Sequence, residues 1–247
     1  GEQVEGRQAV RELLLGQRRR IREIWLASDI ETSPVIEDIL DLARDQRVQV
    51  MSVSRRELDR EARSEAPQGV LAKAAPIEET SLADLLIESR DNPLLLVAID
   101  GVTDPGNLGA ILRCCDGAGV DAVILPRHRA VHITPTVAKS SAGAIEYLNM
   151  CVVGGLPSAL AEMKQAGVFV VGLDDAAEKS IFEIGEVAKE SICLVLGAEG
   201  PGMSRLAKER CDLLVNIPML GSLSSLNVSV AAALATYEIV RSRRSSK

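Results

Sequence analysis

Aromatic side chains are scarce in this sequence: one Trp, two Tyr and two Phe make up 2% of its 247 residues. Apolar residues still account for 47% of the chain, so the packing of the core must depend on Leu, Ile, Val and Ala. A surface that stacks the bases of single-stranded nucleic acid needs several exposed rings. The composition therefore argues against that class of binding protein.

Long apolar runs, signal patterns and cysteine pairs are also absent. No stretch approaches the ~18 consecutive apolar residues of a membrane-spanning helix, and the first ten residues lack a cationic segment followed by an apolar one. The five cysteines (Cys114, Cys115, Cys151, Cys193 and Cys211) include no CxxC pair, which favours buried thiols in a reducing compartment. We therefore expect a soluble, cytoplasmic protein. We expect no metal site, because His, Cys and Asp do not cluster at ligand spacing.

The net charge of −7 counts against nucleic-acid binding, because contacts to phosphates need Lys and Arg. The charge is uneven, however. Residues 1–75 hold 13 Lys and Arg against 14 Asp and Glu, whereas residues 91–247 hold 14 against 17. The first section contains two basic clusters, Arg18-Arg19-Arg20-Arg22 and Arg55-Arg56-Arg60-Arg63. Such clusters are usually solvated faces, so charge alone does not predict an RNA ligand.

The apolar spacing divides the chain into two domains. Residues 1–75 read as an αβαβαβ unit with helices at 7–16 and 34–44, strands at 24–26 and 48–53, a short helix capped by Ser54, and a strand from Gly69. Residues 76–92 begin at Pro76, contain a short SLADLL helix and end just before Pro93, and we interpret them as a linker. Residues 93–247 form the second domain.

Continuous runs of Val, Ile and Leu in the second domain predict strands that are covered on both faces. They lie at 94–99, 121–125, 168–173, 192–197 and 213–218, with helices expected near 107–117, 135–143, 157–166, 203–210 and 225–241. The predicted fold class is α/β, with a mostly parallel sheet and helices on both faces. Ligands of such sheets bind beyond the carboxyl ends of the strands.

Three polar, glycine-bearing segments follow predicted strand ends. The first turns at 104–106 and enters a helix that carries Asn107 and Arg113. A purely structural interpretation stays open here, with Asn107 as a helix cap and Arg113 paired with Asp116. The second segment, residues 197–202, combines three glycines with Glu199 and allows a close approach of backbone to ligand.

The glycine pattern of residues 197–202 excludes two common nucleotide-binding classes. It is GxxGxG after a late strand, not GxGxxG after the first, and GxxxxGK[ST] occurs nowhere in the chain. A nicotinamide oxidoreductase and a phosphate-cradling triphosphatase are therefore disfavoured. In the third segment, a polar loop with Ser224 and Ser225 precedes a helix of small residues. The serines serve either as helix caps or as part of a polar binding site.

Together, the three segments resemble the SpoU (TrmH) family of RNA ribose 2′-O-methyltransferases, which belongs to the SPOUT class. The first matches the family's N-x-G-x-x-x-R and the second its L-G-x-E-G-x-G. The third matches I-P-M…S-L-N-V-S-V-A. The sequences of residues 100–105, 140–144 and 221–227 are similar to those of the family branch that modifies a guanosine of 23S ribosomal RNA. Two elements near the start of the chain, at 6–10 and 68–70, match the same branch.

The resemblance implies a fold feature and a cofactor. The feature is a C-terminal trefoil knot, which general experience with protein topology would not suggest. The cofactor is S-adenosyl-L-methionine, expected to bind to backbone groups near Gly197, Ile217 and Leu226, together with Ala198, Gly202 and Met219. The resemblance also implies that residues 1–75 bind the RNA substrate, a 23S-type ribosomal RNA, and that the protein is a homodimer.

Arg113 matches the family's catalytic arginine. A guanidinium group is effectively always protonated, so an arginine base is chemically awkward. We interpret Arg113 as the group that holds an RNA phosphate and polarises the nucleophile; a perturbed arginine base stays open as the alternative. The resemblance gives the hydrogen-bond frame of the site to Asn107, Glu199, Ser225 and Asn227.

Other functions remain open at this point. His128 and His132 lie outside the three motifs, and we interpret them as structural or RNA-edge residues. A transfer-RNA ribose methyltransferase of the same family is the main alternative. A resistance-type methyltransferase and a catalytically inactive RNA-binding protein of ribosome assembly are the others. The complete set of motif residues argues against the inactive form.

Overall fold

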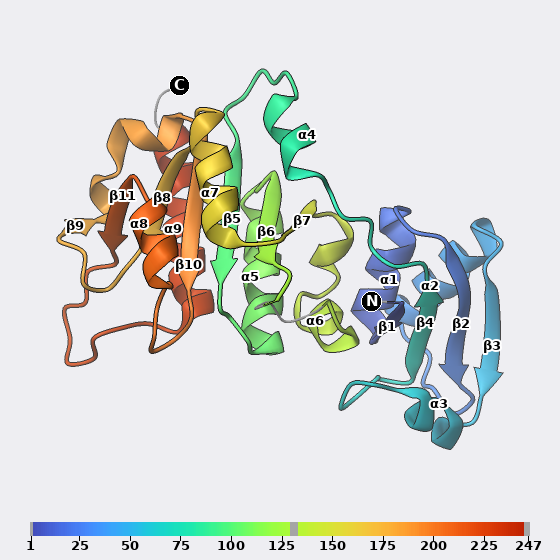
Figure 1. Ribbon diagram of the computed structural model, residues 1–247. Coiled ribbons are helices and arrows are strands. Elements are labelled where there is room, and N and C mark those ends of the chain that lie inside the picture. The colour runs from blue at the N-terminus through green and yellow to red at the C-terminus, as the bar shows by residue number, and fades with distance from the viewer. Residues whose placement is uncertain (1, 129–132, 245–247) are drawn as a thin grey trace. The chain divides into compact units, whose positions relative to one another are not determined.

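The computed structural model describes residues 2–128 and 133–244 (Figure 1). His132 lies outside the described residues. The contacts divide the chain into two compact units. The first contains residues 2–78, 108–113 and 133–147, and the second contains 79–107, 114–128 and 148–244. Each unit is described separately.

The first unit contains a four-stranded mixed sheet. Its elements are β1 (Gln3–Glu5), α1 (Arg7–Gly16), β2 (Ile21–Ala27), α2 (Pro34–Asp45), β3 (Gln49–Val53), α3 (Arg55–Glu61) and β4 (Val70–Ala74). The strand order is β1-β4-β2-β3, in which β2 and β3 are parallel and the other two pairs are antiparallel. The predicted αβαβαβ succession is present, with β1 as an unpredicted first strand.

Local sequence explains the helices of this unit. Helix α1 buries Ala9, Val10, Leu13 and Leu14, which form the apolar face that its spacing predicts. Ser54 caps α3 as expected, because its side chain accepts a hydrogen bond from the Glu57 amide at 3.2 Å.

The second unit contains a seven-stranded sheet in the order β7-β6-β5-β10-β8-β11-β9 (Figure 1). Its strands are β5 (Leu95–Asp100), β6 (Ala122–Pro126), β7 (Met150–Val153), β8 (Phe169–Leu173), β9 (Lys179–Ser180), β10 (Ile192–Gly197) and β11 (Leu213–Asn216). Every strand pair in it is parallel. The predicted α/β fold with a parallel sheet is confirmed, and β7 and β9 are additional to the five predicted strands.

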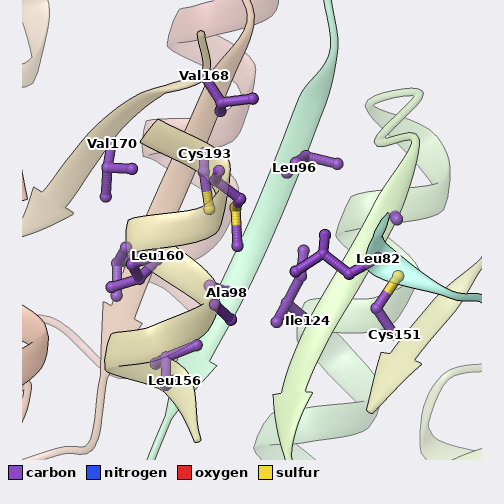
Figure 2. Packing of buried hydrophobic residues seen from close by; sticks show 14 of the residues in the cluster. Leu82, Leu96, Ala98, Ile124, Cys151, Leu156, Leu160, Val168, Val170 and Cys193 are labelled. Atoms are coloured by element: carbon purple, nitrogen blue, oxygen red, sulfur yellow. The ribbon is translucent and has the colours of Figure 1, made fainter. Parts of the chain in front are cut away.

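Helices cover both faces of this sheet. Around it lie α4 (Leu82–Ile87), α7 (Leu156–Gln165), α8 (Arg205–Arg210) and α9 (Val228–Arg244), and the short 3-10 helices η2 (Ile181–Glu183) and η3 (Gly185–Lys189) precede β10. In Figure 1, α7 and α8 lie in front of the sheet and α9 lies behind it. On the α7 side, Leu156 and Leu160 pack against buried strand residues such as Ala98 and Cys193 (Figure 2).

Several helices differ from their predicted bounds, and three of these differences have a local cause. Helix α5 (Pro105–Gly117) is capped by Asp104, whose Oδ2 accepts from the Asn107 amide at 2.7 Å, so Asn107 is not the cap. Helix α6 (Pro135–Ser140) ends before residue 143, because Ala142 and Gly143 take left-handed φ values of 51° and 83° before the 3-10 turn η1 (Ala144–Glu146). Helix α9 begins at Val228 instead of residue 225.

The five cysteines are buried or partly buried, as expected from the sequence. Cys115, Cys151 and Cys193 are buried, Cys114 and Cys211 are partly buried, and all five are unpaired thiols. Burial raises the pKa of the Cys151 thiol to about 11, which keeps it protonated and unreactive. Within the described ranges, no helix is long and apolar enough to cross a bilayer.

Candidate active site

The carboxyl ends of three adjacent strands form one edge of the large sheet. Gly197 at the end of β10 pairs with Asp100 at the end of β5, and β8 follows on the other side of β10. The buried Asp100 carboxylate accepts a hydrogen bond from the Ser204 amide at 2.6 Å and so fixes the first turn of α8. A cleft opens at this edge, where the sheet geometry predicts a ligand site.

The glycine-rich segment forms a tight turn along one wall of the cleft. Ala198 and Gly202 exchange backbone hydrogen bonds of 3.2 and 2.9 Å, which closes the turn at residues 198–202. Gly200 and Gly202 have φ values of 80° and 69°, in the region that favours glycine. The two glycines leave their peptide groups uncovered by side chains on this wall.

Gly197 has no room for a side chain. A Cβ atom built on it would lie 2.2 Å from the Met203 amide nitrogen and 2.3 Å from the Gly202 carbonyl carbon. Both contacts are with backbone, which cannot move without opening the turn. The glycine of the second motif is therefore required by the folding back of the loop onto the end of β10.

The N-terminus of α9 closes the opposite wall. The Glu199 carboxylate accepts a hydrogen bond from the Val228 amide at 3.0 Å, which connects the glycine-rich turn to the first residue of α9. Asn227 caps the helix, because its Oδ1 accepts from the Ser229 amide at 2.9 Å. This side-chain cap explains why the serines at 224 and 225 remain outside the helix.

Asn227 also connects α9 to α5. Its Nδ2 donates to Oδ1 of Asn107 at 3.0 Å. Hydrogen bonds therefore connect all three motifs. Glu199 of the second motif bonds to the start of α9, and Asn227 of the third motif bonds to Asn107 of the first. Ser225 lines the same cleft as Glu199.

Arg113 lies six residues beyond Asn107 on α5, and its side chain is exposed. Among the residues that the structure describes, it makes no hydrogen bond or ion pair, so the alternative pairing with Asp116 is not formed. Gly109 of the same motif has a packing role: a Cβ atom there would lie 1.8 Å from the Ser140 hydroxyl oxygen.

Most of the residues predicted to hold the methyl donor line the cleft. The lining includes Gly197, Ala198, Gly202 and Leu226. Ile217 and Met219 do not line it; both are partly buried in the segment between β11 and the polar loop. Their contact with a donor stays a prediction.

Three charged residues in the cleft were not predicted. Asp174 and Asp175 follow the end of β8, and Lys208 comes from α8. Lys208 Nζ lies 2.6 Å from Asp174 Oδ2, and this hydrogen bond lowers the pKa of the Asp174 carboxyl group. The signal was present in the sequence as two acids directly after a buried strand, at the sheet edge where ligands bind.

The cleft suits a ligand that carries both apolar and polar parts. Leu173, Leu196 and Val228 supply apolar wall, the turn at 198–202 supplies bare peptide groups, and Asp174 supplies a carboxylate. An adenosyl group with an attached amino acid carries both apolar and polar parts, so it suits such a lining. No group of three or more His, Cys, Asp or Glu side chains suited to a metal ion occurs in the described part of the chain.

Comparison with known proteins identifies the family. Residues 94–237 match the SpoU rRNA Methylase family, and residues 3–80 match the family described as RNA 2′-O ribose methyltransferase substrate binding. The chain belongs to the SpoU rRNA methylase family. Part of the second and third motifs lines the cleft, including Gly197, Glu199 and Ser225.

Full-length relatives support the assignment to the SpoU family. The chain is 42% identical over 246 residues to a Pseudomonas putida protein named 23S rRNA (guanosine-2′-O-)-methyltransferase RlmB, covering 98% of this chain and 97% of the relative. It is 44% identical to the RlmB protein of Bordetella pertussis, covering 91% and 90%. The crystal structure of the SpoU methyltransferase AviRb from Streptomyces viridochromogenes, in complex with the cofactor AdoMet, superposes with a TM-score of 0.82 at 27% identity. It covers 99% of this chain and 91% of AviRb.

Proposed function

We propose that this protein transfers a methyl group from S-adenosyl-L-methionine to the ribose 2′-hydroxyl of a guanosine in 23S ribosomal RNA. The observation that carries the proposal is similarity along the whole chain, at 42–44% identity, to proteins named for this reaction. The match includes both the methylase part and the substrate-binding part. A transfer-RNA substrate is disfavoured because the agreement with ribosomal RNA enzymes extends through residues 3–80.

The bound donor supplies a methyl group on a sulfonium cation. In the transfer, the ribose oxygen forms a bond to the methyl carbon, the carbon–sulfur bond breaks with its electron pair left on sulfur as a neutral thioether, and the hydroxyl proton passes to solvent water. The attack spreads the positive charge of the sulfonium over the reacting atoms, so orientation in a desolvated site contributes much of the acceleration. The task of the chain is therefore to position two ligands and to assist the departure of one proton.

Arg113 is proposed to act on the RNA side of this reaction. Its exposed guanidinium has no partner within the described ranges, which leaves its five donors available for a phosphate and for the ribose. Asn107, Asn227 and Glu199 form the frame that fixes the starts of α5 and α9 relative to each other. Ser225 is proposed to contact the ribose from the cleft wall.

The proposal includes a division of the chain into two domains and a trefoil knot in the second of them. Residues 1–75 are proposed to select the RNA, 76–92 to form a linker, and 93–247 to form the methyltransferase domain with a trefoil knot in its C-terminal part. The two family matches, at 3–80 and 94–237, support this division. The AdoMet complex of AviRb supports the cofactor assignment.

We also propose a homodimer that forms through α9. Ala232 and Ala235 are buried against the protein's own sheet, but Val230, Leu234 and Tyr237 are 48%, 43% and 48% exposed. Their spacing of four and three residues places them on one helix face. A second copy would cover this apolar stripe. Light scattering at micromolar concentration tests it: a mass near that of one chain, 26.4 kDa, rejects the dimer.

Mapping of 2′-O-methyl groups tests the reaction. Ribosomal and transfer RNA from cells with and without this protein are compared for protection of each ribose from alkaline cleavage. The expected result is the loss of one guanosine methyl group in 23S RNA, restored by the wild-type protein. A loss confined to transfer RNA would replace the substrate, and an unchanged pattern in both would reject the activity.

A further inference from the structure

A cleft lined by arginines lies in the first unit, at the end of the sheet where β2 and β3 begin and where α1 and α2 finish (Figure 1). Its lining residues are Gln17, Arg19, Arg20, Ile21, Arg22, Gln46, Arg47 and Val48. This lining contains four arginines and no Asp or Glu, in a chain whose net charge is −7. The donor cleft, in contrast, carries three carboxylates.

The four arginines of this cleft differ in their partners. Arg19 is held in place: its side chain is 4% exposed, and it pairs with Glu146 and donates to the Ala75 carbonyl at 3.0 Å. Arg20, Arg22 and Arg47 are exposed and make no side-chain hydrogen bond or ion pair with any described residue. The guanidinium groups of Arg20, Arg22 and Arg47 are therefore exposed to solvent, whereas the side chain of Arg19 is buried and neutralised by Glu146.

Two residues with long polar side chains have a left-handed backbone conformation at the cleft. Gln17 ends α1 with φ at 51°, and Arg47 follows α2 with φ at 57°. Glycine or asparagine occupies such left-handed positions at lower cost. The dipole of a helix favours a cation near its C-terminus, which explains one basic residue at the end of each helix. It does not explain why the lining of the cleft contains no acidic residue. Strained positions that keep a functional side chain are typical of binding sites.

We infer that Arg20, Arg22 and Arg47 form a binding site for the phosphate backbone of the RNA substrate. Planar guanidinium groups bind phosphate oxygens in pairs, and an acid-free wall avoids repulsion of the polyanion. The site is separate from the part of this unit that matches the family motifs. Gly6 and Gly69 lie at the opposite end of the sheet, where their backbone groups bond to Val70 and Ala27. The inference rests on the proposed function only in requiring an RNA substrate.

The test uses the full-length protein and 23S RNA transcribed in vitro. The variant R20A/R22A/R47A is compared with K179A/R210A/R244A, which removes the same charge from exposed positions of the second unit. Affinity for RNA is measured by filter binding between 50 and 300 mM NaCl. Donor affinity is measured by calorimetry, and methyl transfer is measured with labelled donor.

The cleft variant is expected to bind RNA at least tenfold more weakly, with a log–log salt slope smaller by about 2 to 3, since each phosphate contact contributes roughly 0.7–0.9. Donor affinity is expected to stay unchanged. R47G alone is expected to weaken RNA binding while it retains the wild-type melting temperature. Glycine relieves the left-handed backbone strain of the folded state, and this gain offsets the larger conformational entropy that glycine gives to the unfolded chain. That result separates binding from folding.

Two results would overturn the inference. One is a cleft variant that binds RNA with the wild-type affinity and slope. The other is an equal loss in the control variant, which would show a general effect of charge. Failure of the proposed function gives a different result: the wild-type protein then binds 23S RNA without methylating it, and the comparison of slopes still decides the role of the cleft.

Discussion

The Asn227 side-chain amide donates to the Asn107 carbonyl oxygen at 3.0 Å, across 120 residues of sequence. The same Asn227 accepts from the Ser229 amide through its own oxygen. One amide group therefore caps α9 and connects it to the helix that carries Arg113. A carboxylate could cap but not donate, and a hydroxyl of serine is too short for both, so the geometry explains why asparagine occupies the position.

Two substitutions separate the roles of Asn227. Asn227→Asp keeps the acceptor for the cap and loses the donor to Asn107, so we expect near wild-type stability but a clear fall in methyl transfer. Asn227→Ala loses both and is expected to cost about 0.5–2 kcal/mol of unfolding free energy as well. Urea denaturation and turnover with labelled donor measure the two effects. Full activity of the aspartate variant would show that the link to α5 has no role in catalysis.

Gly197 provides a steric test of the donor cleft. Gly197→Ala places a Cβ atom 2.2 Å from the Met203 amide nitrogen, so the turn at 198–202 must open. We expect the affinity for S-adenosyl-L-methionine to fall at least tenfold in calorimetry. Gly154→Ala is the matched control, because a Cβ atom there meets nothing within 4 Å and its φ is not left-handed. Equal affinities in the two variants would place the donor elsewhere.

Strands that consist of continuous apolar residues were predictable, and strands that bury polar residues were not. The strands at 94–99 and 192–197 were found because almost every residue in them is apolar and buried. Strand β1 was missed because two of its three residues are Gln3 and Glu5. Both are buried, and the Glu5 carboxylate accepts from the amides of Arg63 and Ser64. Periodicity cannot show a polar side chain that is satisfied by a distant loop.

The site was predictable where it depends on motifs and not where it depends on tertiary contacts. The motif spacing indicated Glu199 and Asn227, but their partners, the Val228 amide and Asn107, required the fold. Asp174 directly follows a predicted strand and was identifiable from the sequence, but its ion pair with Lys208 of α8 depends on tertiary contacts. The sequence does not specify which helix lies beside the end of β8.

The ion pair between Lys208 and Asp174 predicts a pH dependence. Lys208 lowers the pKa of the Asp174 carboxyl group, so the folded protein holds this proton less tightly than the unfolded chain. The stabilisation is therefore fully present above the ordinary aspartate pKa of about 3.9 and is lost as the pH falls through the lowered value. Lys208→Met is expected to be less stable than wild type from pH 7 to about 5, with a difference that shrinks as the pH falls below about 3.9.

Urea denaturation of wild type and Lys208→Met at pH 7, 5 and 3 measures that difference. Carbon NMR of labelled aspartate provides a direct reading, in which the Asp174 pKa rises in the variant. Lys189→Met is a control, because Lys189 pairs with Glu186 on η3, and neither residue lines the cleft. A stability difference that grows as the pH falls would contradict the direction of the shift.

Arg113 gives the sharpest test of the proposed chemistry, because its exposed guanidinium has no partner in the described part of the chain. Its removal should therefore leave the fold intact. Arg113→Ala is expected to keep the melting temperature and to keep donor and RNA affinities within tenfold, while turnover falls by at least ~10²–10³, the usual effect of losing one transition-state donor. Arg113→Lys keeps the charge but loses the planar guanidinium group, and we expect it to recover only a small part of the rate.

The pH profile of methyl transfer by the lysine variant distinguishes the two possible roles of Arg113. If Arg113 orients the phosphate and ribose, the lysine variant keeps the wild-type profile at a lower rate. If Arg113 is the base, the profile of the lysine variant shifts to lower pH with the lower pKa of the amine. Wild-type turnover in the alanine variant would remove Arg113 from the catalytic site.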